Sequence, residues 1–235
     1  MKQYRTVVLG SGHFAAGYCS VLKDTLIVER TYLADAEASA TLSGYRTDLS
    51  SDLTDEAKEL HGFYTESKMA NGNKLDSPIL EVGLSAYAKR RGIKFLFGTE
   101  CTEIKESEGG YLLTLFGNAG FETVFASGVI DNRKEKGNTL RVLVRAQKEA
   151  AGKLKLDCAE TKITDAFYDE DCIISFKFPE NTNINAAKTL IMRELETQLP
   201  DGGCIIQMAN LMTDKDTDPI RRFNEGVLLA KEETV

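Results

Sequence analysis

The residues whose types and spacing most clearly indicate a chemical function form a glycine turn near the N-terminus, made of Gly10, Ser11, Gly12, His13, Phe14 and Ala15. Gly10 permits a tight turn, and Gly12 lets the backbone come close to a pyrophosphate. Ala15 takes the third small position of a G-x-G-x-x-G/A motif. Glu29 follows Gly10 by 19 residues, the separation at which a carboxylate accepts hydrogen bonds from a ribose.

Two strands and a helix are needed to hold these residues together. Residues 4–9 form an apolar, valine-rich run typical of a buried parallel strand, a helical pattern continues through Leu22, and residues 25–28 form a second strand. The start of such a helix offers unpaired N–H groups and a positive dipole end to phosphates. This order predicts a dinucleotide site. The alternative is a glycine-rich turn of another α/β protein, with Glu29 as a solvated charge at a strand end.

Composition narrows the class of protein. The chain has 235 residues, a net charge of -7 and a pI of about 5.1, which disfavours nucleic acid and anionic membranes as partners. No apolar run is long enough for a transmembrane helix, and a strand begins too early for a signal peptide. Five scattered cysteines and two histidines predict reduced thiols, no metal site and a cytoplasmic protein.

The rest of the first half predicts two more helices and a group of strands. The helices are expected at residues 52–63 and 78–91, and a strand at 94–97 follows the second helix. Glycine turns then separate three short strands at residues 100–106, 111–116 and 121–126, which predict an antiparallel meander. A further short strand at 128–132 ends this half.

This order resembles the FAD-binding domain of two-domain flavoprotein oxidoreductases of the glutathione-reductase type. The resemblance covers residues 4–132, from the glycine turn and Glu29 through the segments GIKFLFGTECTEI, GYLLTL and GVIDN. It implies FAD as cofactor, backbone contact with the adenine at Cys101, and a closing strand near the cofactor that carries Asp131. The family usually has V-I-x-A-T/A-G in that strand, whereas this chain has Val129-Ile130-Asp131-Asn132-Arg133.

The second half predicts an antiparallel sheet with one long helix. Strands are expected at residues 140–146, 154–158, 161–168, 172–178 and 204–208, and a helix at 185–199. Asp218 and Pro219 begin a last amphipathic helix. The fold class is therefore α/β, a Rossmann-like FAD/NAD(P)-binding domain with an antiparallel meander and a smaller α+β substrate domain. We expect domains at residues 1–135 and 136–212, with residues 213–235 returning to the first.

Three functions are compatible with these residues. The first is an FAD-dependent oxidoreductase that transfers hydride or electrons to or from an unidentified small molecule. The second is an NAD(P)-binding reductase; Glu29 argues against a 2′-phosphate, and Arg30 weakens that argument. The third is a non-catalytic nucleotide-binding protein or subunit of an oligomer or larger complex, favoured by the altered closing strand and by the lack of a clean Gly-Asp before the last helix.

Individual side chains also leave alternatives open. His13 either donates to a phosphate, faces the flavin, or points at solvent. Asp216 or Asp218 either takes the place of the family's Gly-Asp, or Asp218 is only a helix cap. No acid–base pair stands out, so the sequence predicts cofactor-binding residues and no catalytic ones.

Overall fold

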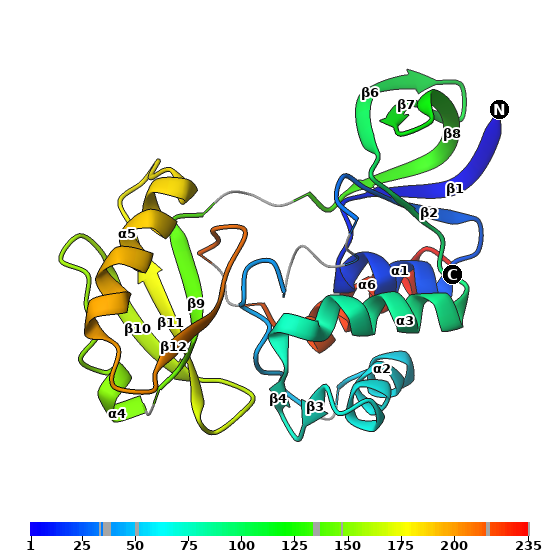
Figure 1. Ribbon diagram of the computed structural model, residues 1–235. Coiled ribbons are helices and arrows are strands. Elements are labelled where there is room, and N and C mark those ends of the chain that lie inside the picture. The colour runs from blue at the N-terminus through cyan, green and yellow to red at the C-terminus, as the bar shows by residue number, and fades with distance from the viewer. Residues whose placement is uncertain are drawn as a thin grey trace.

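The protein is described from a computed structural model, shown in Figure 1, which places residues 1–32, 34, 39–49, 52–133, 137–146, 148–214 and 217–234. Two lobes are visible, each built on its own sheet, with loops running between them. Within these residues, no helix has the length and apolar character needed to cross a membrane.

The first lobe is built on a mixed sheet of six strands in the order β5-β2-β1-β8-β7-β6. The strands are β1 (Lys2–Leu9), β2 (Thr25–Glu29), β5 (Phe95–Phe97), β6 (Glu100–Ser107), β7 (Gly110–Gly117) and β8 (Gly120–Asp131). β5, β2, β1 and β8 are parallel, and β6, β7 and β8 pair antiparallel. The prediction of an α/β protein with a parallel sheet is confirmed.

The parallel part of this sheet is covered on both faces, which explains its continuous apolar runs. Val8 of β1 packs with Ala15 and Tyr18 on the helical side, and Val7 and Leu9 pack on the other side. The second set joins Leu113, Leu115 and Val124 of β7 and β8, so these strands curl over the sheet, as Figure 1 shows at the top. The pleat of β1 thus divides its side chains between helices and curled strands.

β8 is one continuous strand, whereas the sequence predicted two strands in this region. Residues 121–126 and 128–132 were expected to be separate, but β8 runs unbroken through Gly128. Its first part pairs with β7 and its later part with β1, and the two pairings overlap from Val124 to Ala126. Gly128 itself pairs with Thr6 of β1, and this one partner strand continues past the glycine that a local pattern takes for a break.

Five helical segments complete the first lobe. They are α1 (His13–Val21), α2 (Asp55–Glu66), η1 (Ser77–Ile79), α3 (Leu80–Arg91) and α6 (Pro219–Glu232), and the short strands β3 (Ala70–Asn71) and β4 (Lys74–Leu75) lie between α2 and η1. α6 comes from the end of the chain, yet its backbone packs directly against that of α1. The two helices are so close at Gly17 that an added Cβ would overlap the carbonyl oxygen of Phe223. The first helix and the last are therefore a single packed unit beneath the sheet (Figure 1).

The second lobe is an antiparallel sheet in the order β10-β11-β9-β12. Its elements are β9 (Thr139–Arg145), α4 (Lys148–Ala151), β10 (Glu160–Asp165), β11 (Asp171–Lys177), α5 (Ile184–Gln198) and β12 (Cys204–Met208). The Asn183 side chain accepts from the amides of Asn185 and Ala186 at the start of α5. Ala187, Ile191 and Leu195 repeat along α5 at helical spacing and are its buried face.

The predicted strand at 154–158 is wrong. Only Leu156 forms an isolated bridge, with Ala159, and the segment is otherwise loop. Leu154 and Leu156 are buried in the core of the second lobe, so these apolar residues pack as loop side chains. Apolar alternation alone does not provide the neighbouring strand that a β-strand needs.

The segment after β2 joins the two lobes. Leu42 is fully buried in the core of the second lobe, and the carbonyl oxygen of Ala40 accepts from the amides of Asn210 and Leu211 at 2.7 and 2.9 Å. On the other side, the Thr47 amide donates to the carbonyl oxygen of Asn73, between β3 and β4, at 2.9 Å. Residues 39–49 therefore contact both lobes.

Candidate functional site

The glycine turn between β1 and α1 adopts a backbone that requires glycine. Gly10 has φ of +90° and Gly12 of +135°, both in the region that L side chains rarely adopt. A Cβ at Gly10 would lie 3.0 Å from the amide nitrogen of Arg133 and 3.1 Å from the carbonyl oxygen of Asn132. The turn is thus pressed against the end of β8, and Asn132 Nδ2 donates to the Ser11 carbonyl oxygen at 3.2 Å.

Glu29 ties this turn to the end of β2. Its Oε2 accepts from the Ser11 amide and its Oε1 from the Thr31 amide, both at 2.8 Å, and the residue is 5% exposed. Because β1 and β2 are parallel, their carboxyl ends meet at one edge of the sheet, where nucleotides bind in open α/β sheets. The spacing of 19 residues therefore places the carboxylate beside the turn.

The start of α1 provides the backbone groups for an anion. The helix begins at His13 with Gly12 as its N-cap, and the Ala16 amide donates to the Gly12 carbonyl oxygen at 3.0 Å. The first amides of such a helix, with the positive end of its dipole, attract phosphate. Ala15 is fully buried against the sheet, where a larger side chain would push the helix away.

His13 does not point at solvent, so that alternative is wrong. The side chain is fully buried, and its Nε2 lies 2.8 Å from the hydroxyl of Tyr64 on α2. The rings meet edge to face with centroids 6.0 Å apart. The ring is turned toward α2, since α2 packs beside α1, a contact that sequence does not reveal. Contact between His13 and a phosphate or the flavin stays a prediction.

Phe14, at the first turn of α1, lies beneath the guanidinium group of Arg222, which the sequence did not predict to be near the turn. The Arg222 guanidinium carbon lies 5.1 Å from the Phe14 ring centroid, and Arg222 also pairs with Glu225. The arginine comes from α6, which the Gly17 and Gly226 contacts bring against α1. Its only signal in the sequence is a pair of arginines after Pro219, and nothing there indicates proximity to the turn.

Asp131, at the end of β8, holds an arginine of its own. Arg133 Nε and Nη2 donate to the two oxygens of Asp131 at 2.9 and 2.6 Å, and this bidentate pair lowers the pKa of Asp131. Both side chains are half-exposed. The positive charge of Arg133 also acts to lower the pKa of Cys101, the residue of β6 at which adenine contact is expected.

Cys101 lies on this edge as a half-buried thiol. Its Sγ donates to the Glu103 carbonyl oxygen at 3.4 Å, and burial raises its pKa. The Thr99 amide donates to the Glu29 carbonyl oxygen at 3.0 Å, which connects the segment before β6 to the end of β2. The structure therefore brings Gly10, Glu29, Cys101 and Asp131 to the same edge.

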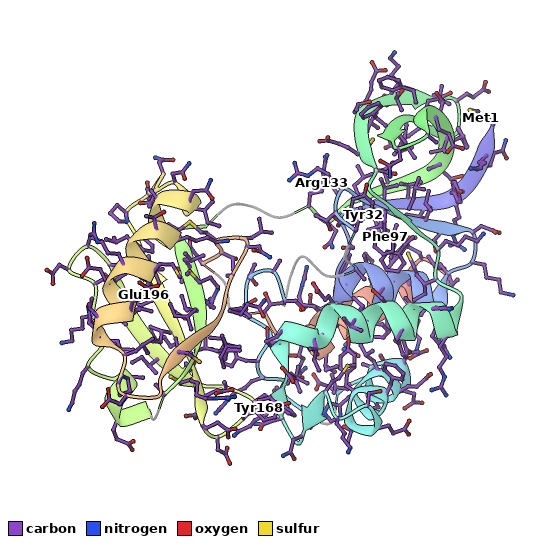
Figure 2. The ribbon with its side chains drawn as sticks, in the orientation of Figure 1. Met1, Tyr32, Phe97, Arg133, Tyr168 and Glu196 are labelled. Atoms are coloured by element: carbon purple, nitrogen blue, oxygen red, sulfur yellow. The ribbon has the colours of Figure 1, made fainter. Side chains whose placement is uncertain are left out.

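Arg30 and Tyr32 form the exposed rim beside Glu29. Arg30 is exposed, and Tyr32 lies over Gly98, where a Cβ would be 2.7 Å from the ring. The Asn118 amide donates to the Tyr32 hydroxyl at 3.0 Å. Figure 2 labels Tyr32 beside Phe97, the residue of β5 that precedes Gly98. Tyr32 was not among the predicted site residues, since an isolated tyrosine in a loop has no distinctive signal.

Asp218 is a helix cap. Its Oδ1 accepts from the Arg221 amide at 3.1 Å and its Oδ2 from the Asp48 amide at 2.8 Å. Both oxygens are used in fixing the start of α6 to the segment after β2. Asp216 lies outside the described residues. Within those residues, no group of three His, Cys, Asp or Glu side chains is arranged to hold a metal ion.

Comparison with solved structures shows what the fold is similar to. The monooxygenase PnpA of Pseudomonas putida, a p-nitrophenol 4-monooxygenase, aligns with a TM-score of 0.58 at 11% identity over 98% of this chain and 78% of its own. A flavoprotein/dehydrogenase of Cytophaga hutchinsonii aligns with a TM-score of 0.52 at 15% identity, over 98% and 76%. This chain has a flavoprotein-type α/β fold.

A third likeness covers less of the other protein. BexE, described in connection with oxidation during BE-7585A biosynthesis, aligns with a TM-score of 0.54 at 12% identity over 88% of this chain. The chain spans about half the length of BexE, 52%. No family model and no curated protein matches the sequence.

Proposed function

We propose that this protein binds FAD and uses it to transfer hydride or electrons to or from a small organic molecule. The observation that carries the proposal is the bond from the Ser11 amide to Glu29, which holds the glycine turn and the ribose-binding carboxylate together at one sheet edge. A glycine-rich turn with an unrelated strand-end charge does not need a buried carboxylate at this place. The flavoprotein-type fold supports the same reading.

The residues present fit a dinucleotide. Glu29 would accept from ribose hydroxyls, and the amides from Gly12 to Phe14 would hold the pyrophosphate. Gly10 and Gly12 have positive φ, which favours glycine, and because glycine has no Cβ the backbone of the turn is open to the pyrophosphate. Backbone at Cys101 would contact the adenine, and Asp131, neutralised by Arg133, would lie near the cofactor.

Bound FAD supplies the redox chemistry. The chain binds and orients it, and the packed pair of α1 and α6 keeps the pyrophosphate end rigid. We propose the division into residues 1–135, 136–212 and 213–235, with the second lobe binding substrate. The separate core of that lobe supports this division, and Leu42 is an exception because it packs there from the first segment.

Two alternatives are retained. An NAD(P)-binding reductase would use the same turn, with the exposed Arg30 available to a phosphate. A non-catalytic nucleotide-binding subunit is favoured by the side chain of Asn132 where the family has a small residue, and by the use of both Asp218 oxygens in helix capping.

The test is the absorption spectrum of the purified protein, followed by titration of the stripped protein with FAD and with NADH. The two bands of oxidised flavin, or uptake of added FAD, are expected. Binding of NADH alone would favour the reductase, and binding of neither would favour the non-catalytic subunit. Either result contradicts the proposal.

A variant assigns the binding to the turn. Gly12→Asp places a side chain and a negative charge where the pyrophosphate would lie, and we expect at least about 100-fold weaker FAD binding. Gly62→Asp is the matched control, since Gly62 on α2 has nothing within 4 Å of an added Cβ. Equal FAD affinity in the two variants would rule out the turn as the site.

A further inference from the structure

A cavity lies between the two lobes, where the turn after β10 meets η1. Its volume is about 190 Å³, and its walls are mostly apolar, with Tyr45, Leu143 and Ile173 among the lining residues. Its polar lining includes two acids, one arginine and two hydroxyl groups, which are Asp76, Asp171, Arg145, Tyr168 and Ser77. In Figure 2, Tyr168 lies at the end of the second lobe that faces β3 and β4. The cavity shares none of the residues assigned to the glycine turn or to Glu29.

Asp76 is a buried carboxylate without a structural task in its own helix. It is 6% exposed and immediately precedes η1, where an aspartate ordinarily caps the helix with its side chain. Here the side chain makes no capping bond. Its hydrogen bond in the described part of the chain is a long one, with the Tyr168 hydroxyl 3.5 Å from Oδ2. A carboxylate removed from water normally needs stronger compensation than this.

The cations near the cavity are each held by another acid. Arg145 Nε donates to Asp171 at 3.0 Å, and Lys74 Nζ donates to the exposed Asp169 at 2.8 Å. Arg46 likewise pairs with Asp165 at 3.0 Å. Among the described residues, Asp76 takes part in no ion pair. Burial and the like charge of Asp171 raise the pKa of Asp76, whereas the hydrogen bond from Tyr168 lowers it.

We propose that this cavity binds a small molecule with an apolar body and a protonated amine, whose N–H groups donate to the carboxylate of Asp76. The ammonium group would supply the charge and donors that Asp76 lacks, and the apolar walls would hold the body. A cavity of about 150 Å³ is known to hold a benzene ring, so 190 Å³ suits one ring with a short side chain. This site goes beyond the proposed FAD function and does not require it.

The probe is benzylamine, titrated into the full-length protein as purified and followed by calorimetry. Benzyl alcohol and benzoate have nearly the same shape and differ in charge. We expect benzylamine to bind in roughly the millimolar range, as its few heavy atoms allow, and at least about 10-fold more tightly than either analogue. Equal binding of the three compounds, tighter binding of benzoate, or no binding of benzylamine would overturn the proposal.

Two variants assign the binding to this cavity. Asp76→Asn keeps the shape and removes the charge, and is expected to weaken benzylamine binding at least about 10-fold, while Asp169→Asn, at a nearby exposed carboxylate, should leave it within about twofold. Ile206→Trp at the partly exposed wall should fill the cavity and abolish binding without altering Asp76. Unchanged affinity in either Asp76→Asn or Ile206→Trp would refute the assignment.

Flavin content is measured in the same samples by absorbance. A colourless protein that binds benzylamine through Asp76 would contradict the FAD proposal and leave this one intact. A flavin-containing protein that does not bind benzylamine would contradict the amine site and leave the FAD proposal intact.

Discussion

Gly17 of α1 lies against the carbonyl oxygen of Phe223 of α6, so closely that an added Cβ would overlap it. Gly226 makes the reciprocal contact, with the carbonyl oxygen of Phe14. These two glycines allow the last helix of the chain to lie directly on the helix that begins at the nucleotide turn. The same contact brings Arg222 over Phe14.

Gly17→Ala is therefore expected to destabilise the protein. The added methyl group forces α1 and α6 apart, and we expect a loss of about 1–3 kcal/mol in the free energy of unfolding, measured in urea. Gly62→Ala is the control, because its Cβ meets nothing within 4 Å and alanine favours a helix by about 0.5–1 kcal/mol. Opposite signs are expected for the two variants, and a neutral Gly17→Ala would mean that the helices separate without cost.

Glu29→Gln should destabilise the turn even without a cofactor. Both carboxylate oxygens accept from backbone amides, those of Ser11 and Thr31. In glutamine one oxygen is replaced by an NH₂ group, which would face one of these N–H donors with another donor. A loss of about 1–3 kcal/mol is expected, since the facing amide then lacks an acceptor. Urea unfolding of FAD-stripped protein measures it, with Glu100→Gln at an exposed position as control. If both variants unfold at the same urea concentration, the Ser11 and Thr31 bonds do not hold the turn.

Arg133→Ala should raise the pKa of Asp131 toward its usual value. The bidentate bond lowers that pKa, so the pair stabilises the folded protein above the usual pKa of aspartate, and this contribution is lost as pH falls through the lowered value. Because both side chains are half-exposed, the loss of stability at neutral pH should stay below about 1 kcal/mol.

NMR titration of the Asp131 carboxyl carbon checks this shift. Arg193→Ala, which removes an exposed pair with Glu194 on α5, should leave the Asp131 titration unchanged. An Asp131 pKa that is the same in Arg133→Ala and in the parent protein would show that the pair does not form in solution.

Asp76→Asn should stabilise the protein at neutral pH. The raised pKa of Asp76 means that the folded state binds this proton more readily than the unfolded state. The contribution of Asp76 to stability is therefore greatest in acid and is lost as pH rises through the raised value. Removing the buried charge should add about 0.5–2 kcal/mol near pH 7, and the gain should vanish below the usual pKa of aspartate.

Urea unfolding of both proteins across about pH 3–8 measures this difference. Asp169→Asn is the control, and its stability is expected to follow the parent's at every pH. A variant that is less stable than the parent at neutral pH would show that the Asp76 carboxylate already has adequate partners in the folded protein. That result would also remove the reason for an amine at this cavity.

The local parts of the candidate site could be predicted from sequence because they depend on neighbouring residues. A valine-rich strand, two glycines, a small residue and an acid after the next strand determine the turn, the start of α1 and the position of Glu29. The buried face of α5 and the Asp218 cap follow in the same way from spacing within one helix.

Contacts between distant segments were decided only by the tertiary structure. His13 turns toward Tyr64 because α2 packs there, and β8 continues through Gly128 because β1 pairs with it before and after that glycine. Arg222 reaches Phe14 because two glycines let the helices touch. Asp76 and Tyr168 meet only because the two lobes do. Sequence periodicity records which face of an element is buried, whereas the identity of the residue on the other side depends on how the elements pack.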